Sequence, residues 1–151
     1  MSYWLHFYSL PPAAQAHLPR QPEQVTAFLN SKARKVGEIP FSAGEASLLL
    51  NLVGDLIDVP LIALKKGELG GIVFAADSPS FGGLPRELGE EAVVELRKLQ
   101  RGEEPYDQEN LGAIAVRYTI PPEEFARKLE LLASLIEQSL ANGGELATFY
   151  E

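Results

Sequence analysis

Short aromatic segments with the alternating pattern of β-strands lie near both ends of the chain. The first spans residues 3–9 and is followed by Pro11 and Pro12, and the second spans residues 146–150. Strands of this length are not stable alone and must pair within a larger sheet. We therefore predict that both terminal strands belong to one small mixed or antiparallel sheet, within a single compact α+β domain over residues 1–151.

Four segments between these strands carry helical signals. The sharpest is the S-x-x-E spacing of Ser42 and Glu45, which is typical of a capping box at a helix N-terminus. The apolar run that follows extends to Ile57, is wide enough for a largely buried helix, and ends before Pro60. The other three predicted helices span residues 23–35, 87–101 and 123–141.

Shorter segments complete the expected architecture. Residues 61–64 are left open as either a strand or a continuation of the preceding helix. The glycine-rich segments 67–71 and 81–83 lack the spacing and the lysine of a phosphate-binding loop, so both are predicted to be turns. Further strands are predicted at 72–76 and 114–120, and loops at 78–85 and 102–110.

The amino-acid composition excludes several kinds of catalytic and metal-binding site. The chain has no cysteine, which excludes disulfide staples, cysteine nucleophiles, iron–sulfur clusters and thiolate zinc sites. With only two histidines, His6 and His17, an all-histidine metal centre is excluded as well. No G-x-S-x-G elbow presents a serine nucleophile. We therefore expect no catalytic residue, cofactor or metal. The sequence contains no motif that supports an enzymatic activity, but it does not exclude one.

Hydropathy gives an expectation about location. No basic, apolar and small-residue segments follow one another as in a signal peptide, and no stretch approaches the roughly 18 apolar residues of a membrane-spanning helix. We therefore expect a cytoplasmic protein with no membrane association.

Charge is distributed unevenly along the chain. Residues 1–36 carry a net charge of +3 and the remainder carries −11, with eight acids against four bases between Arg86 and Glu109. A nucleic-acid binder shows the opposite bias, because contacts with phosphates supply most of its affinity.

The acidic segment predicts a non-catalytic protein that engages a basic protein partner. The candidate contact residues are Glu87, Glu91, Glu103 and Asp107. Immunity-type inhibitors of basic nuclease toxins share this profile of small size and strong acidity. The alternative interpretation is a solvated helix face, in which early acids and late bases complement the helix dipole.

A second candidate site lies on the first strand. Alternation places Trp4, His6 and Tyr8 on one face, opposite the residues expected in the core. Such an aromatic surface could bind a small molecule or belong to an enzyme, because it combines contact area with polar groups. The alternative, which we favour, is that a helix covers this face and that His6 is a hydrogen-bonded core residue.

The two most apolar helical segments, 46–57 and 125–140, raise the question of self-association. The first carries more apolar residues than packing on one sheet requires. Leftover apolar area usually ends in an interface, and a two-fold homodimer is the commonest closed assembly. The alternative is that residues 61–76 fold over this helix within one subunit.

Parts of the chain resemble small uncharacterised bacterial proteins of the YfbM-like kind. The resemblance lies in the opening M-S-Y-W-L-H-F-Y-S, in the helical segment 90–101, and in the helix 123–141 followed by N-G-G-E-L. It covers about half of the chain and has no counterpart for residues 42–57. The resemblance implies a compact α+β bacterial domain and carries over no catalytic residue.

Overall fold

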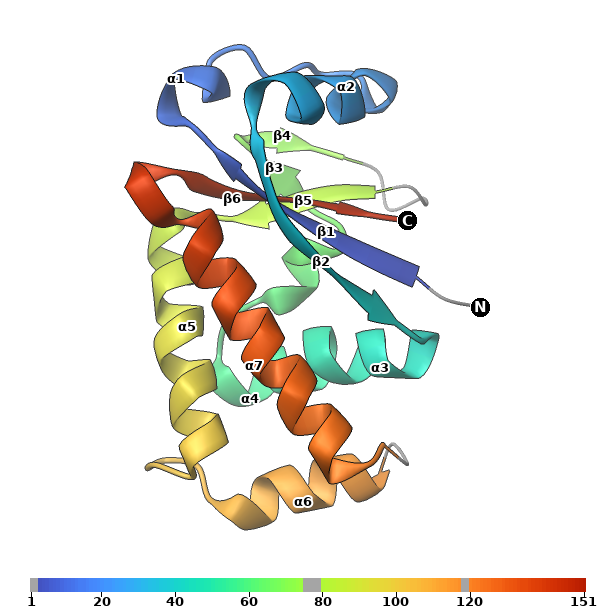
Figure 1. Cartoon of the computed structure of the whole chain (residues 1–151), viewed down its shortest axis with the longest axis vertical. Coiled ribbons are helices and arrows are strands. Elements are labelled where there is room, and N and C mark those ends of the chain that lie inside the picture. Colours follow the sequence, from blue (N-terminus) through green and yellow to red (C-terminus); the bar gives the residue numbers. More distant parts are fainter. Residues whose placement is uncertain (1–2, 75–79, 118–119) are drawn as a thin grey trace.

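The computed structural model describes residues 3–74, 80–117 and 120–151 and contains a four-stranded antiparallel sheet (Figure 1). The strand order is β2 (Arg34–Phe41), β1 (Tyr3–Leu10), β6 (Glu145–Tyr150) and β5 (Ser80–Leu84). β1 pairs with β6 over six residue pairs. The predictions of an α+β domain and of a sheet that contains both terminal strands are confirmed.

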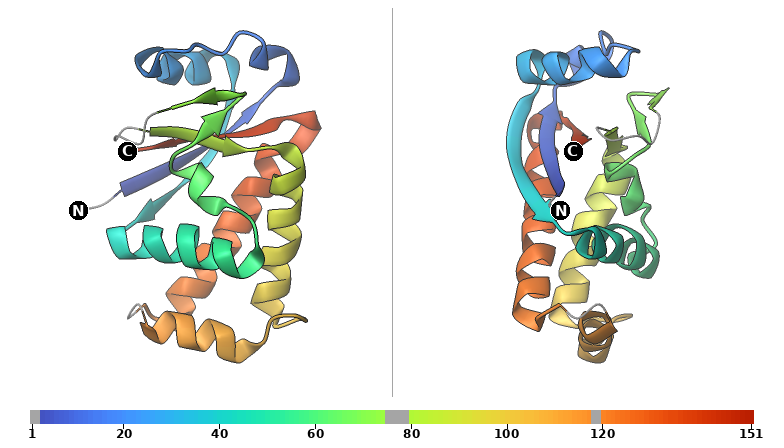
Figure 2. Two further views of the ribbon diagram at one scale, coloured as in Figure 1. Left: turned by 180° about the vertical axis from the view of Figure 1, so that it is seen from behind. Right: turned by 90° about the vertical axis from the view of Figure 1, so that its right-hand side faces the viewer.

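Helices cover one face of this sheet. α5 (Arg86–Arg101) and α7 (Pro122–Ser139) lie side by side and antiparallel, and α6 (Gln108–Arg117) crosses their far ends (Figures 1 and 2). α7 contacts β1, β2 and β6, as predicted for the last helix. The larger of two apolar clusters fills this side and includes Leu5 and Phe7 of β1.

The other face of the sheet is covered by smaller elements. α1 (Pro12–Gln15) and α2 (Pro22–Lys32) lie beyond the ends of β1 and β2, and a hairpin of β3 (Glu68–Leu69) and β4 (Ile72–Val73) packs beside β5. The second apolar cluster lies here and includes Tyr8 and Leu10. Gly70 and Gly71 form the hairpin turn with φ of +58° and +84°, a conformation that glycine adopts readily. The turn predicted at 67–71 is confirmed at Gly70 and Gly71, whereas Glu68 and Leu69 within it form β3.

The predicted capping box begins the middle helical segment. The Ser42 N–H donates to Glu45 Oε1 at 3.0 Å, and the Glu45 N–H donates to Ser42 Oγ at 3.2 Å. The segment then continues through α3 (Ala43–Ser47), a π-helical turn η1 (Leu48–Leu52) and α4 (Val53–Ile57). Asp58, in a left-handed conformation with φ of +57°, ends the helix.

The many apolar residues of this helical segment are buried by other parts of the same chain. Leu48, Leu49, Leu50 and Val53 are all buried, and the 3-10 helix η2 (Leu61–Leu64) packs against η1 and α4. This corresponds to the alternative in which the segment after Pro60 folds over the helix. The reason given for a homodimer therefore no longer holds, and the oligomeric state stays a prediction.

The predicted helix 23–35 is wrong at its C-terminal end. α2 ends at Lys32, and the residues that follow form the edge strand β2. The basic residues of this segment imitate the last turn of a helix, but Ile39 and Phe41 alternate toward the core and pair with β1. Pairing with a neighbouring strand outweighs the local helical signal.

Several other sequence predictions also fail or hold only in part. The loop predicted at 78–85 contains β5, so the turn predicted at 81–83 is wrong. The strand predicted at 114–120 is wrong over 114–117, which belong to α6 between α5 and α7, and residues 118–119 lie outside the described residues. α6 also includes residues 108–110, at the end of the loop predicted at 102–110. The strand predicted at 72–76 is reduced to β4, and its last two residues lie outside the described residues.

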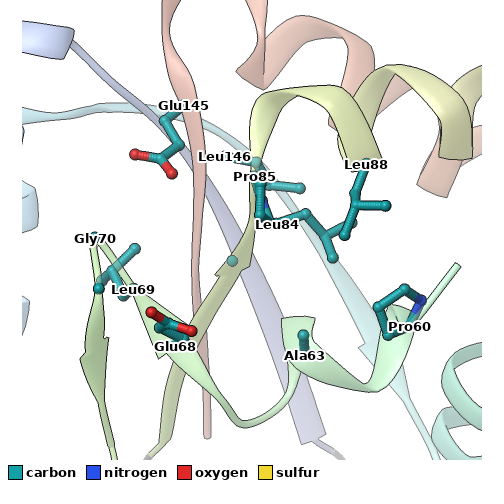
Figure 3. Close-up of a pocket in the computed structure, with 12 residues that line it drawn as sticks. Pro60, Ala63, Glu68, Leu69, Gly70, Leu84, Pro85, Leu88, Glu145 and Leu146 are labelled. Carbon is teal, nitrogen blue, oxygen red and sulfur yellow. The ribbon is translucent and has the colours of Figure 1, made fainter.

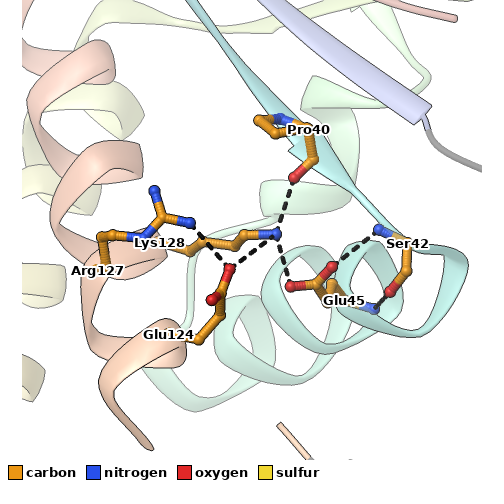
Figure 4. Close-up of polar contacts among 6 residues, drawn as sticks. All are labelled: Pro40, Ser42, Glu45, Glu124, Arg127 and Lys128. Atoms are coloured by element: carbon orange, nitrogen blue, oxygen red, sulfur yellow. Dashed lines mark hydrogen bonds and ion pairs between the residues drawn. The ribbon is translucent and has the colours of Figure 1, made fainter. Parts of the chain in front are cut away.

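A buried lysine joins three elements below the sheet (Figure 4). Lys128 of α7 is 6% exposed, and its Nζ lies 2.6 Å from Glu45 Oε2 and donates to the Pro40 carbonyl at 2.9 Å. Glu124 Oε1 lies 3.8 Å from the same nitrogen. Burial by itself raises the pKa of Glu45, but hydrogen bonds from Lys128 and Ser42 outweigh it and hold the pKa below its usual range.

The first prediction concerns Gly82 of β5. A Cβ at this position would collide with the backbone carbonyl of Ala63 in η2, which is held against the sheet by a 2.7 Å hydrogen bond from Thr148 Oγ1 to the Leu64 carbonyl. We expect Gly82→Ala to lower the free energy of unfolding by about 1–3 kcal/mol. Gly44→Ala is the matched control, because a Cβ added there would meet no atom within 4 Å beyond its own helix backbone and chain neighbours. Urea denaturation of both variants measures the difference, and equal midpoints would contradict this packing.

The second prediction concerns Lys128. Because the folded pKa of Glu45 is lowered, its contribution is full above the ordinary glutamate pKa of 4.5 and is lost as the pH falls through the lowered value. We expect Lys128→Met to cost about 2–3 kcal/mol at pH 7 and to reduce this acid dependence, since Glu45 loses its cation.

Arg127→Met is the control for this experiment. Arg127 is the neighbouring residue, it is exposed, and its Nη2 lies 2.9 Å from Glu124 Oε1. An exposed pair of this kind contributes about 0–1 kcal/mol. Urea denaturation between pH 3 and pH 7 compares the two variants, and equal losses at every pH would refute the buried role of Lys128.

Candidate functional site

A cavity of about 300 Å³ lies between the β3–β4 hairpin, the start of α5 and the start of β6 (Figure 3). Its walls are mostly apolar and include Ala63, Leu69, Leu84, Leu88 and Leu146. Two carboxylates, those of Glu68 and Glu145, enter it from different elements. The cavity therefore combines an apolar lining with negative charge.

Local structure fixes the position of Glu145. It is the first residue of β6 and pairs with Leu10, the last residue of β1. Just before it, the guanidinium of Arg86 donates to the carbonyl oxygens of Leu140 at 2.7 Å and of Gly144 at 2.9 Å. These bonds tie the start of α5 to the end of α7 and leave that guanidinium engaged with backbone oxygens.

The carboxylate of Glu145 is electrostatically unfavourable where it lies. Its Oε2 atom is buried and has no hydrogen-bond partner among the described residues. Burial raises the pKa of Glu145 above its usual range, and the negative charge of Glu87 raises it further. Carboxyl groups with perturbed pKa values beside a cavity are candidates for a functional role.

The four acids predicted for partner binding are all exposed but lie in two places. Glu87 and Glu91 lie on the N-terminal half of α5, whereas Glu103 and Asp107 follow its C-terminal end. The part of α5 between Glu91 and its C-terminal end is about 15 Å long, at 1.5 Å per residue, and separates the two pairs. Glu103 lies 3.2 Å from Arg101, so this carboxylate already has a cation beside it.

The N-terminal half of α5 carries an exposed apolar residue among its acids. Val94 is 53% exposed and lies one turn after Glu91 and two turns after Glu87. Neither acid forms an ion pair among the described residues, whereas Glu90 is paired with Arg86. We call Glu87, Glu91 and Val94 the α5 surface; its Glu87 end lies next to the cavity.

The three residues of the predicted site on β1 are buried to different extents. His6 is held between two carboxylates, with Nδ1 3.0 Å from Glu38 Oε2 and Nε2 3.0 Å from Glu151 Oε1. Its ring also stacks on Phe149 at a centroid distance of 5.5 Å. The His6 side chain is only 12% exposed, which corresponds to the hydrogen-bonded alternative.

Tyr8 and Trp4 do not join His6 in one open site. Tyr8 is buried in the second apolar cluster, and its hydroxyl lies 3.4 Å from Asn30 Oδ1 of α2. Trp4 is 39% exposed near the other end of the strand. The face is therefore closed at Tyr8 and open at Trp4, with His6 between them.

The sequence prediction missed both Glu68 and Glu145. The signal available for Glu145 is one acid at the start of an otherwise apolar aromatic strand, directly after a predicted helix end. Glu68 appears in the sequence only as a polar residue within a turn. Their common location depends on contacts between segments more than 70 positions apart, which the sequence pattern does not reveal.

Three further observations concern the kind of site. Among the described residues, no three histidine, aspartate or glutamate side chains gather to hold a metal ion. Within those same residues, no helix has the length and apolar character needed to cross a membrane. Comparison with family models, curated proteins and solved structures gave no match, so the YfbM-like resemblance stays a prediction.

The third prediction follows from the raised pKa of Glu145. The folded protein holds this proton more tightly than the unfolded chain, so the free energy of unfolding falls as the pH rises above 4.5 through the folded pKa. We expect Glu145→Gln to be more stable than the wild type at pH 7, by less than about 1 kcal/mol because water partly screens the carboxylate.

This difference in stability should vanish below pH 4.5, where the wild-type carboxyl group is protonated in both states. Glu91→Gln, on the exposed side of α5, serves as the control and should not follow this pattern. Thermal melts between pH 4 and pH 8 provide the measurement. A Glu145→Gln variant that is less stable than the wild type at pH 7 would show that this carboxylate is favourable.

Proposed function

We propose that this protein is a non-catalytic cytoplasmic binding protein that engages a basic protein partner through the α5 surface. The observation that carries the proposal is the exposure of Glu87 and Glu91 without ion pairs among the described residues, beside the exposed Val94. Nearby acids that have a cation, such as Glu90 and Glu95, contribute less to the local field.

The physical basis of the proposal is a combination of attraction and contact. Unpaired carboxylates steer a basic partner toward the surface and raise the association rate. The exposed apolar Val94 beside these acids then supplies contact area that excludes water. Glu103 and Asp107 lie farther along the acidic segment, and Glu103 contributes less to the field because Arg101 lies beside it.

The site predicted at Trp4, His6 and Tyr8 supports no second proposed function. Tyr8 is buried and His6 is held by Glu38 and Glu151, so a ligand would have to displace existing contacts. Only Trp4 offers an open aromatic surface.

The fourth prediction uses a variant in which Glu87→Gln, Glu91→Gln, Glu103→Gln and Asp107→Asn are combined. Because exposed acids contribute little to stability, we expect this quadruple variant to fold as the wild type does. We expect it to recover less of the partner from the native lysate. With the purified partner, we expect the association rate to fall about tenfold or more, and added salt to reproduce the loss in the wild type.

A matched control removes the same charge elsewhere. It combines four exposed positions outside the acidic segment: Glu23→Gln, Asp55→Asn, Asp58→Asn and Glu123→Gln. This control should keep partner recovery and association rate close to those of the wild type. Equal recovery of the partner by the wild type and the quadruple variant at low salt would contradict the proposed function. Equal losses of partner binding in the quadruple variant and the control would show that only the net charge of the protein matters, which would also contradict a specific role of the α5 surface.

A further inference from the structure

We propose that the cavity beside Glu145 binds an aliphatic primary ammonium group together with its carbon chain. The ammonium would lie at Glu145, with Glu68 adding negative charge elsewhere in the lining, and the chain would pack along the apolar wall. This chemistry has two sources, a free alkylamine or a lysine side chain of a protein, and the experiment below separates them.

The size and lining of the cavity support a short apolar chain. Its volume of about 300 Å³ is at the lower end of the range for small-molecule sites, about 300–1,000 Å³. Leu69 of the hairpin, Leu88 of α5 and Leu146 of β6 supply apolar surface from three elements. A methylene chain against these side chains would gain from leaving water.

The charges in and around the cavity select a cation. Figure 3 shows the carboxylates of Glu145 and Glu68 extending from two sides toward the same space. Glu87 adds a third negative charge close enough to affect Glu145. An anionic ligand would be repelled by these carboxylates, whereas a cation would reduce the repulsion between Glu145 and Glu87.

The unpartnered oxygen of Glu145 specifies a hydrogen-bond donor. Its Oε2 atom is buried and accepts no hydrogen bond from the described residues, and a buried acceptor without a partner is costly. The nearby guanidinium of Arg86 donates to the carbonyls of Leu140 and Gly144 instead. A bound ammonium would donate to the other oxygen of this carboxylate, and its positive charge would lower the electrostatic cost of the buried Oε2.

A metal ion fits this arrangement less well than an ammonium. Hard cations require six or more oxygen ligands or several retained waters. Among the described residues, no group of three carboxylates or histidines is positioned to begin such a shell. The apolar wall likewise contributes nothing to metal coordination but favours an organic cation.

The experiment is an NMR titration of the ¹⁵N-labelled protein at pH 7 and low salt with n-pentylamine, n-pentanol and pentanoate. We expect pentylamine to shift the backbone amides that surround the cavity, including those of Gly70, Gly83 and Leu146. Pentanol, which has the chain without the charge, should bind about tenfold more weakly or worse. Pentanoate should produce no shifts in this region.

Variants then test the role of each carboxylate. Glu145→Gln should weaken pentylamine binding about tenfold or more, and Glu68→Gln should weaken it less because Glu68 is exposed. Glu23→Gln, at an exposed position of α2 outside the cavity, should leave the affinity unchanged. Pentanol binding equal to that of pentylamine, full affinity in Glu145→Gln, or the absence of localised shifts would each overturn the proposal.

A further comparison identifies the source of the amine. Nα-acetyl-lysine amide carries the same ammonium on a side chain attached to a blocked backbone. Binding as tight as that of pentylamine would indicate a lysine side chain, and binding of pentylamine alone would indicate a free alkylamine. The quadruple variant of the partner test keeps Glu145 and Glu68 and loses only the nearby charge of Glu87, so its pentylamine affinity should fall by no more than about threefold even if it loses the partner.

Discussion

The pairing of β1 with β6 is the contact on which the other elements depend, because it joins the two ends of the chain at the centre of the sheet. The apolar residues of both strands alternate between the two clusters: Leu5, Phe7 and Leu146 enter the larger one, and Tyr8, Leu10 and Ala147 enter the second. The register of this pairing also places Glu145 opposite Leu10, at the end of the sheet where the cavity opens. The geometry of the candidate site is therefore a consequence of the same hydrogen bonds that close the fold.

Signals that are satisfied within a few residues could be predicted from the sequence. The capping box of Ser42 and Glu45 needs only neighbours three positions apart, and the helix forms as expected. β2 and β5 were missed because their partners lie far away in the chain. β5 has two adjacent glycines and a low strand propensity, yet Gly82 is required there by the close approach of the Ala63 carbonyl. The constraint comes from tertiary packing, which no local window contains.

The same distinction applies to the candidate site, because some of its residues could be predicted from the sequence and others could not. The acids of α5 could be located from charge pattern and helical spacing, because an exposed helix face is a property of the sequence itself. Glu145 gains its importance only from burial, from the nearby charge of Glu87 and from the engagement of Arg86 elsewhere. On β1, alternation correctly separated the two faces but could not show that α2 closes one end at Tyr8.

Lys128 and Glu145 are two charged residues that lie partly or fully out of water, and their surroundings compensate their charges to different extents. Lys128 has Glu45, Glu124 and the Pro40 carbonyl within reach, so its ammonium is neutralised and hydrogen-bonded inside the chain. Glu145 faces a cavity with one oxygen left without a donor and with negative rather than positive neighbours. A charge that is fully compensated needs no ligand to explain it, whereas an uncompensated one lowers stability and is retained where function requires it. This contrast distinguishes the structural role of Lys128 from the binding role inferred for Glu145.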